Sequence, residues 1–137
     1  MAERDELDAH DEFRRSLAQP LLETGDILRY RRDEVPPQML QRLRRGLYAV
    51  QDEIDLHWSD AATAEAMLRR FLAESLQSGF GCVRIVHGKG LHSDSVVPVL
   101  KNLVDRVLRQ RADVLAFHSA PLSQGDTGAV LVLLRKG

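Results

Sequence analysis

The sequence has 137 residues, of which 44% are hydrophobic, and a formal net charge of −1 at pH 7. This length and composition predict one domain with a sizeable core, and the near-zero charge argues against a uniformly basic nucleic-acid-binding protein. No apolar run approaches the roughly 18–20 residues that cross a bilayer, and the acidic residues 1–12 do not resemble a signal or transit peptide. The single Cys82 cannot form an internal disulfide. We therefore expect a cytoplasmic protein without a membrane partner, and a monomer is favoured.

The first part of the chain, residues 1–50, is predicted to be a helical extension that precedes the main domain, residues 51–137. Apolar side chains at spacings of three and four predict a helix over residues 3–18. A proline pair opens a second helix over residues 38–46. Residues 21–35 between the two helices are expected to form a linker.

This linker contains an aromatic ring within a run of arginines. Arginines around a ring can hold a nucleic-acid backbone while the ring stacks on a base, so Arg31 and Arg32 are candidate nucleic-acid contacts. The alternative is a solvated arm that the ring of Tyr30 holds in place.

Glu53–Trp58 is predicted to be the first strand of the main domain. Its alternation places Ile54 and Leu56 on one face and Asp55 and His57 on the other. If helices cover the apolar face, a carboxylate and an imidazole stand together near the C-terminal end of the strand. The alternative is a buried structural Asp–His pair.

A helix over residues 61–77 and a strand over Cys82–Val86 follow. A helix between two strands favours a right-handed crossover, and therefore a parallel pair of strands. The polar residues at the ends of parallel strands emerge at one edge of the sheet, where ligands bind in open α/β sheets. We therefore expect Asp55, His57 and His87 to lie together.

The second strand runs directly into His87-Gly88-Lys89-Gly90. The two glycines allow a positive φ and remove side-chain bulk, so backbone N–H groups can face an anion. Lys89 adds a positive charge, and an imidazole with an ordinary pKa of about 6.5 suits proton transfer near neutrality. The loop predicts a phosphate site; the alternative is a tight turn with an incidental histidine.

The remaining chain predicts one more helix and two more strands. The helix has its cap at residue 93 or 94 and runs to about residue 111, so its free N–H groups follow the glycine loop and favour a bound anion. The third strand covers residues 114–120, and its His118 is expected to cap the sheet. Residues 129–134 are apolar on both faces, which predicts a strand in the interior of the sheet.

Three motifs in this order resemble the Smr (small MutS-related) domain, over about residues 51–136. Ile54-Asp55-Leu56-His57 is similar to the Leu-Asp-Leu-His signature of that family, with Ile in the first place. His87-Gly88-Lys89-Gly90 matches its histidine-glycine loop, and Gly125-Asp126-Thr127-Gly128 is similar to its glycine-rich turn. Each motif alone is weak, but three in the right order with helices of the right length between them are specific.

The chain departs from the family pattern at two positions. Trp58 stands where the family usually has Gly, and Asp126 stands where a second Gly is common. Neither change removes a candidate catalytic group.

The resemblance implies an α/β fold, a two-layer α+β sandwich in which a βαβαββ unit builds a four-stranded mixed sheet. This fold is similar to the C-terminal domain of the third translation initiation factor. The resemblance also implies nuclease activity, either nicking of DNA or cutting of messenger RNA near stalled ribosomes, so DNA, RNA and the ribosome are the expected partners. The functional positions of the family fall on Asp55, His57, His87, Gly88 and Lys89.

Together these observations lead to an endonuclease hypothesis. His87 or His57 would act as general base or acid, and Asp55 would orient a histidine or hold a divalent metal. A single evident acid favours a metal-independent or one-metal site. The sequence commits to no cofactor; Mg²⁺ or Mn²⁺ at Asp55 is the candidate.

Lys89 and the backbone N–H groups of Gly88 and Gly90 would stabilise the charge that builds on the phosphate oxygens. The further candidate contacts to nucleic acid are Trp58, Gly125, Thr127, Gly128, Arg31 and Arg32.

Two other functions compete with this one. A non-catalytic DNA-, RNA- or ribosome-binding module would use Lys89, Trp58 and the arginines but make the histidines structural, with strongly salt-dependent binding and no cleavage. A protein-interaction domain would contact its partner through the acidic N-terminus.

Overall fold

The computed structural model describes residues 21–89 and 98–136. From β1 (Arg29–Arg31) the chain continues through α2 (Pro37–Arg44), β2 (Asp52–Asp55), α3 (Ala61–Gln77), β3 (Cys82–Val86), α4 (Val99–Gln110), β4 (Val114–Ser119), the short 3₁₀ helices η1 (Leu122–Gln124) and η2 (Asp126–Gly128), and β5 (Ala129–Leu134). The helix expected over residues 3–18, Gly90 and the first residues of the helix predicted after residue 93 lie outside the described residues.

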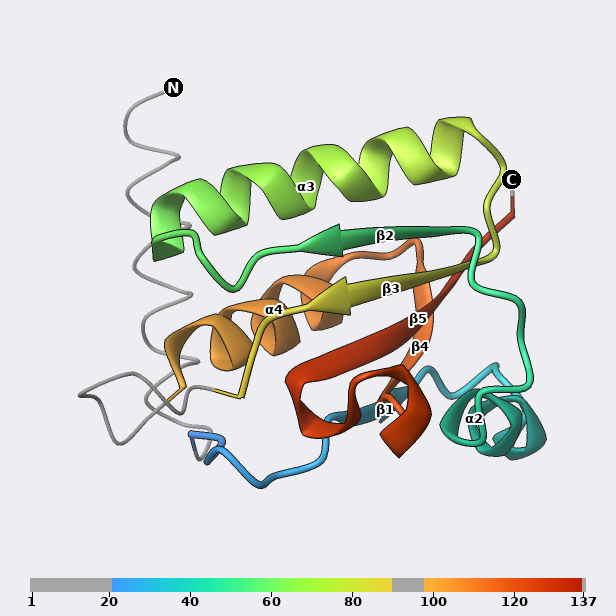
Figure 1. The fold of residues 1–137 in the computed structure, drawn as a ribbon. Helices are drawn as coiled ribbons and strands as arrows, with labels where there is room; N and C mark the ends of the chain where they lie inside the picture. The colour runs from blue at the N-terminus through green and yellow to red at the C-terminus, as the bar shows by residue number, and fades with distance from the viewer. Residues whose placement is uncertain (1–20, 90–97, 137) are drawn as a thin grey trace.

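The strands form one mixed sheet in the order β1-β4-β5-β3-β2 (Figure 1). β2 and β3 are parallel, as predicted from the helix that joins them, and the other neighbours are antiparallel. β5 lies in the interior of the sheet and all its residues are buried, which confirms that prediction. The α/β class is confirmed as well.

The sheet has a fifth strand, where we expected four. β1 lies within the residues predicted to form a linker, and it pairs antiparallel with β4 so that Tyr30 stands opposite Phe117. The two rings stack with their centroids 5.3 Å apart, and the guanidinium of Arg109 lies 5.1 Å from the centre of the Tyr30 ring. Tertiary contacts of this kind hold a strand that is too short to show apolar alternation.

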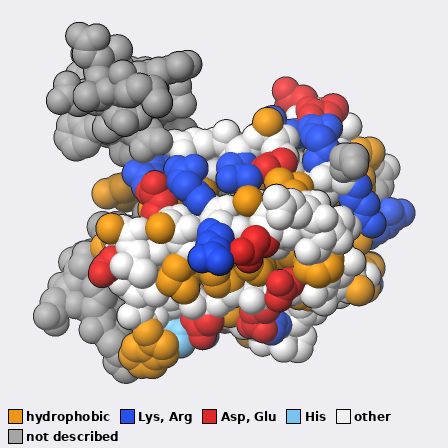
Figure 2. Space-filling view, turned by 90° about the horizontal axis from the view of Figure 1, so that it is seen from above, with side chains coloured by type: hydrophobic (Ala, Val, Ile, Leu, Met, Phe, Trp, Pro, Cys, Tyr) orange, Lys and Arg blue, Asp and Glu red, His pale blue; other side chains and the backbone are white. Residues whose placement is uncertain are grey.

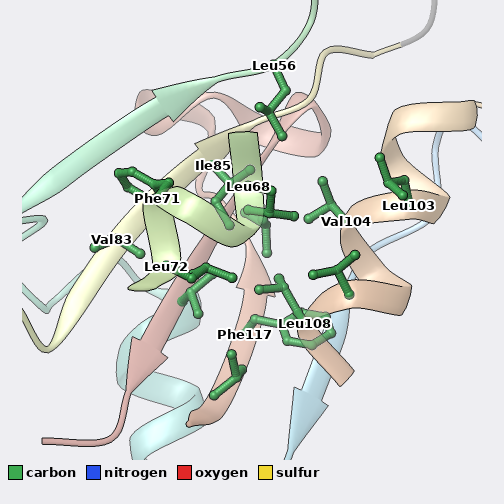
Figure 3. Packing of buried hydrophobic residues seen from close by; sticks show 14 of the residues in the cluster. Leu56, Leu68, Phe71, Leu72, Val83, Ile85, Leu103, Val104, Leu108 and Phe117 are labelled. Atoms are coloured by element: carbon green, nitrogen blue, oxygen red, sulfur yellow. The ribbon is translucent and has the colours of Figure 1, made fainter. Parts of the chain in front are cut away.

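Helices cover both faces of the sheet. α3 and α4 pack on one face, where a large apolar core fills the space between them and the strands (Figure 3). α2 packs on the other face, against β4 and β5, and its Leu40 and Leu43 form a second core with Leu131 and Leu133 of β5. None of the helices in the described part of the chain is both long and apolar enough to cross a membrane.

α3 has the limits that the sequence predicts. The carboxylate of Asp60 accepts a hydrogen bond from the Thr63 backbone N–H at 2.8 Å, which caps the first turn. At the other end Gly79 takes a φ of +73°, a left-handed conformation that suits glycine and stops the helix. α3 thereby links β2 to β3 and fixes their parallel register.

The part of the sheet that α2 leaves open is the face of β2 and β3. Parallel pairing aligns Glu53 with Arg84, and Asp55 with Val86, so these side chains share the face opposite α3 and α4. Glu53 and Asp55 are exposed and Arg84 is half-buried. This open face of β2 and β3 carries the candidate site.

Candidate functional site

Asp55 and His57 form a hydrogen-bonded pair at the end of β2. The carboxylate of Asp55 accepts a hydrogen bond from the backbone N–H of His57 at 3.0 Å and a second one from its ring Nδ1. Leu56 between them is fully buried, so its side chain anchors the turn in the core and the side chains of Asp55 and His57 point away from the core. The side chains of His57 and Asp55 are 32% and 50% exposed, so solvent reaches both. The pair is therefore open to a ligand, unlike the buried structural pair that was the alternative.

The bonds from His57 also set the charge of Asp55. Partial burial would raise the pKa of this carboxyl, but the hydrogen bonds from the His57 ring and backbone outweigh it and hold the pKa of Asp55 below its ordinary value. Asp55 is therefore an anion at neutral pH. With Nδ1 of the ring bonded to the carboxylate, Nε2 is the nitrogen that can accept a proton from a ligand.

The glycine loop lies directly against this pair. Gly88 has a φ of +82°, and a Cβ on Gly88 would stand 3.0 Å from the Cβ of His57. The absence of a side chain at position 88 is therefore what lets the loop approach His57. The first two motifs of the sequence thus meet in space, as predicted.

The backbone N–H groups of the loop are used differently from our expectation. His87 N–H and Gly88 N–H both donate to the carbonyl oxygen of Gly128, each at 3.0 Å. The N–H of Gly88 therefore ties the loop to the turn before β5 and does not face an anion. The prediction that this N–H stabilises a phosphate was wrong, and Gly90 lies outside the described residues.

The third motif closes the site from the other side. A Cβ on Gly128 would stand 3.1 Å from Cγ of Lys89, so the stem of this lysine packs against the turn. The ammonium of Lys89 lies 3.4 Å from a carboxylate oxygen of Asp126. Gly125 has a φ of +117° and Asp126 one of +52°, so this turn is built on two successive left-handed residues. Thr127 follows on the same turn, between Asp126 and Gly128.

His87 does not share the accessible edge with His57. It is 3% exposed, and its alternation with Ile85 places it on the face covered by α3 and α4. Its ring Nδ1 lies 2.8 Å from the carbonyl oxygen of Gly88, and Nε2 is buried without a hydrogen-bond partner among the described residues. Our expectation of two imidazoles facing one ligand is therefore not met, and a catalytic role for His87 stays a prediction.

Burial determines the protonation of His87. It lowers the pKa of the imidazole to about 4; the bond to the Gly88 carbonyl opposes this shift and the nearby ammonium of Lys101 adds to it. His87 is therefore neutral at physiological pH, with the proton on Nδ1 donated to the carbonyl.

Arg84 is a site residue that we did not predict. Its guanidinium lies 2.8 Å from a carboxylate oxygen of Glu53 and donates to the Gln124 carbonyl at 3.5 Å. Arg84 lies on the same face of the sheet as Asp55. It is two residues before Val86, the residue of β3 that pairs with Asp55. The alternation of β3 carries the signal: an arginine between Val83 and Ile85, both buried, must point to the open face.

Trp58 extends the site outward. It is 87% exposed, and its ring centre lies 4.3 Å from that of His57 with the two planes at 47°. The indole therefore does not close the site over. It presents a flat apolar surface beside the imidazole.

Arg31 and Arg32 are not brought to this site. They belong to or follow β1, at the opposite edge of the sheet from β2. Arg31 donates to the Val35 carbonyl at 2.9 Å, and Arg32 donates to the carbonyls of Val114 and Arg111 at 2.7 and 2.6 Å. These bonds attach β1 to the body of the domain. His118 is buried in β4 and bonds the Ser119 carbonyl, in keeping with a structural role.

The surface over α3, on the other side of the sheet from the open face, is not broadly basic: blue and red side chains are intermixed there (Figure 2). Ion pairs of α3 include Arg69–Glu65, Arg70–Glu74 and Arg106–Glu65. Within residues 21–89 and 98–136, no three His, Cys, Asp or Glu side chains gather in a way that could hold a metal ion. A metal at Asp55 would bind a carboxylate that already bonds His57.

Comparison with known proteins identifies the family of this chain. The Smr domain matches residues 54–135. The ribosome rescue factor SmrB of Aliivibrio fischeri (strain MJ11) is 39% identical over 115 residues, which are 84% of this chain and 62% of that protein. SmrB of Vibrio cholerae serotype O1 (strain M66-2) is 40% identical over 106 residues, 77% of this chain and 54% of that one. The chain therefore spans less than two thirds of the length of these relatives.

Two solved structures have the same fold. YdaL, a stand-alone small MutS-related protein from Escherichia coli, superposes with a TM-score of 0.74 at 30% identity, over 85% of this chain and 88% of that one. The Smr domain of Thermus thermophilus MutS2 superposes with a TM-score of 0.54 at 30% identity, over 61% of this chain and 98% of that one.

Proposed function

Because this chain belongs to the Smr domain family, we propose that it binds nucleic acid at the edge of the sheet where its three motifs meet. The observation that carries the proposal is the contact between them: Gly88 against His57, and Lys89 against Gly128. This edge offers a phosphate a lysine and an imidazole, and it offers a base the exposed ring of Trp58. Gly125 and Thr127 shape the turn that supports Lys89.

The partner that we propose is RNA at the ribosome. The relatives with 37–40% identity are named ribosome rescue factors, and a ribosome presents RNA on its surface. The near-zero net charge supports contact through a small site rather than through a wide basic surface.

A second function, cleavage of a phosphodiester bond, is favoured by the Asp55–His57 pair. A carboxylate on Nδ1 fixes the ring and leaves Nε2 as the proton acceptor, which is the arrangement of a general base. His57 would take the proton of the attacking water while the bond from phosphorus to the leaving oxygen breaks. The leaving oxygen would take its proton from solvent, and Lys89 would stabilise the charge on the phosphate.

The experiment that tests both functions uses purified protein with labelled single-stranded RNA, structured RNA and supercoiled plasmid, each with and without EDTA. Binding is measured by fluorescence anisotropy at several salt concentrations, and cleavage by gel electrophoresis. Salt-dependent binding that Lys89→Met weakens supports the nucleic-acid site. Cleavage that His57→Gln abolishes supports the nuclease. Binding without cleavage of any substrate leaves the non-catalytic module, and no binding to RNA, DNA or purified ribosomes contradicts the proposal as a whole.

A further inference from the structure

The lysine of the proposed phosphate site is already paired within the chain. The ammonium of Lys89 lies 3.4 Å from the Asp126 carboxylate, and both side chains are about half exposed. Its stem packs against Gly128, which directs the ammonium toward the turn. A phosphate that binds Lys89 therefore meets an anion that is already there.

The position of the Asp126 carboxylate is fixed by the backbone of the turn. Asp126 has a φ of +52°, the one positive value among the described residues that are not glycine. Its N–H donates to the Pro121 carbonyl at 3.1 Å, and the N–H of Gly128 donates to the Gly125 carbonyl at the same distance. Side chains in this conformation are uncommon, although Asp and Asn tolerate it better than most. The turn thus holds a carboxylate beside Lys89 in a conformation that glycine would adopt without strain.

We propose that Asp126 is an internal competitor for the phosphate at Lys89, and that it limits the affinity of the site for nucleic acid. This inference rests on the proposed function, because it needs Lys89 to contact a phosphate. A carboxylate and a phosphate oxygen offer an ammonium the same kind of hydrogen bond, and the two anions repel each other, so a phosphate binds Lys89 more weakly while the Asp126 carboxylate stays beside it.

Internal competition weakens the binding of every ligand that displaces Asp126 by the same factor. A single inorganic phosphate exchanges one ion pair for another and gains little. A polynucleotide that also contacts Trp58 gains further contacts when it displaces Asp126. The same holds at Arg84, which is paired with Glu53 at 2.8 Å on the same open face. An extended strand therefore holds the site through its added contacts, whereas a small phosphate alone binds too weakly to stay.

The experiment compares Asp126→Asn with a control that removes the same charge elsewhere. Asn keeps the shape of the side chain and tolerates a positive φ, so the turn is retained. Glu74→Gln is the matched control. Glu74 pairs with Arg70 on the exposed surface of α3, so this substitution removes one negative charge at a place away from the turn. Dissociation constants are measured for a fluorescein-labelled single-stranded RNA, with inorganic phosphate as a competing ligand.

We expect Asp126→Asn to bind this RNA about two- to five-fold more tightly than wild type, the range that an exposed ion pair supplies. Glu74→Gln should bind almost as wild type does. In a Lys89→Met background the gain from Asp126→Asn should vanish, because the competitor has lost its target. The inhibition constant of inorganic phosphate, measured by competition against the RNA, should fall in Asp126→Asn by a similar factor.

Two results overturn the inference while leaving the proposed function in place. The first is RNA binding that needs Lys89 but is equal in wild type, Asp126→Asn and Glu74→Gln. The second is a gain from Asp126→Asn that persists with Met at position 89, since this gain would be a general charge effect. If wild type and Asp126→Asn both fail to bind RNA or DNA, the proposed function and the inference fall together.

Discussion

The carboxylate of Asp55 accepts two hydrogen bonds from one residue, His57: one from the ring Nδ1 and one from the backbone N–H. The backbone bond closes a short turn of the kind that Asp makes with the residue two positions on. The ring is therefore oriented by a partner that its own chain segment supplies, without help from a distant element. Because both side chains are accessible to solvent, this ordered pair is available for chemistry.

If the site cleaves nucleic acid, Asp55→Asn should lower the cleavage rate by about 10²- to 10⁴-fold, the usual contribution of an oriented general base. The amide oxygen can still accept a hydrogen bond from Nδ1, but the negative charge that stabilises the imidazolium formed when Nε2 takes a proton is lost. Affinity for RNA should not fall, since the variant removes a negative charge. Single-turnover rates at saturating protein separate the two effects.

Asp52→Asn is the control for this variant. Asp52 lies on the same strand, is exposed, and uses its carboxylate only locally, to accept the Glu53 N–H at 2.8 Å. The Asp52→Asn variant should cleave nucleic acid at the wild-type rate. Equal rates for Asp55→Asn and wild type would show that the Asp55–His57 pair takes no part in cleavage.

Gly88→Ala tests the contact between the glycine loop and His57. A side chain at φ +82° costs roughly 1–2 kcal/mol of stability, and the new Cβ would also push against His57. Gly79→Ala carries the same kind of backbone strain at φ +73°, but its Cβ meets no atom within 4 Å. We expect both variants to unfold at lower urea concentration. Only Gly88→Ala should also lose RNA binding, and a similar loss in Gly79→Ala would contradict the role of this contact.

The sequence predicted those parts of the site that depend on local pattern. The alternation of Ile54, Asp55 and Leu56 and the crossover through α3 were enough to place the pair at the end of parallel strands. The same alternation, continued one residue past the end of β3, places His87 on the buried face with Ile85. The motif predicted that His87 shares the site of His57, whereas the two-residue period of the strand indicates that the two histidines lie on opposite faces of the sheet.

Other parts could not be read from local pattern at all. β1 is three residues long and begins and ends with arginine, so its pairing depends on the stacking of Tyr30 on Phe117 and on the bonds of Arg32 to distant carbonyls. The pairing of Lys89 with Asp126 likewise joins residues 37 apart in the chain. Contacts of this kind follow from the folded arrangement, not from the composition of either segment.

The buried His87 should make stability depend on pH below neutrality. Its folded pKa of about 4 lies below the ordinary 6.5, so the unfolded chain takes up a proton first as the pH falls. The contribution of His87 to the free energy of unfolding is fully present above about pH 6.5 and is lost as the pH falls from about 6.5 to 4. The loss amounts to about 3 kcal/mol at most. Urea unfolding across this range measures it.

The difference between wild type and His87→Gln isolates this histidine. Asp55 also has a lowered pKa, so its contribution is lost at low pH, but that loss is common to both proteins and cancels in the difference. In wild type, the NMR signal of the His87 ring should not titrate above about pH 5. Titration near pH 6.5 would show that the imidazole is accessible after all, and would return it to the list of proton-transfer groups.

Trp58→Ala should weaken binding of single-stranded RNA by about 1–3 kcal/mol, the value of one base stacked on an aromatic ring, and should leave stability almost unchanged. The reason is its 87% exposure beside His57: the ring contributes little to the core and offers its face to a base. Leu122→Ala removes an apolar side chain that is 85% exposed, so it controls for general loss of surface contact and should bind as wild type does. Trp58→Phe should retain part of the affinity. Duplex RNA of the same sequence should bind Trp58→Ala and wild type alike, because its bases are already stacked; an equal loss on duplex and single strand would rule out base stacking.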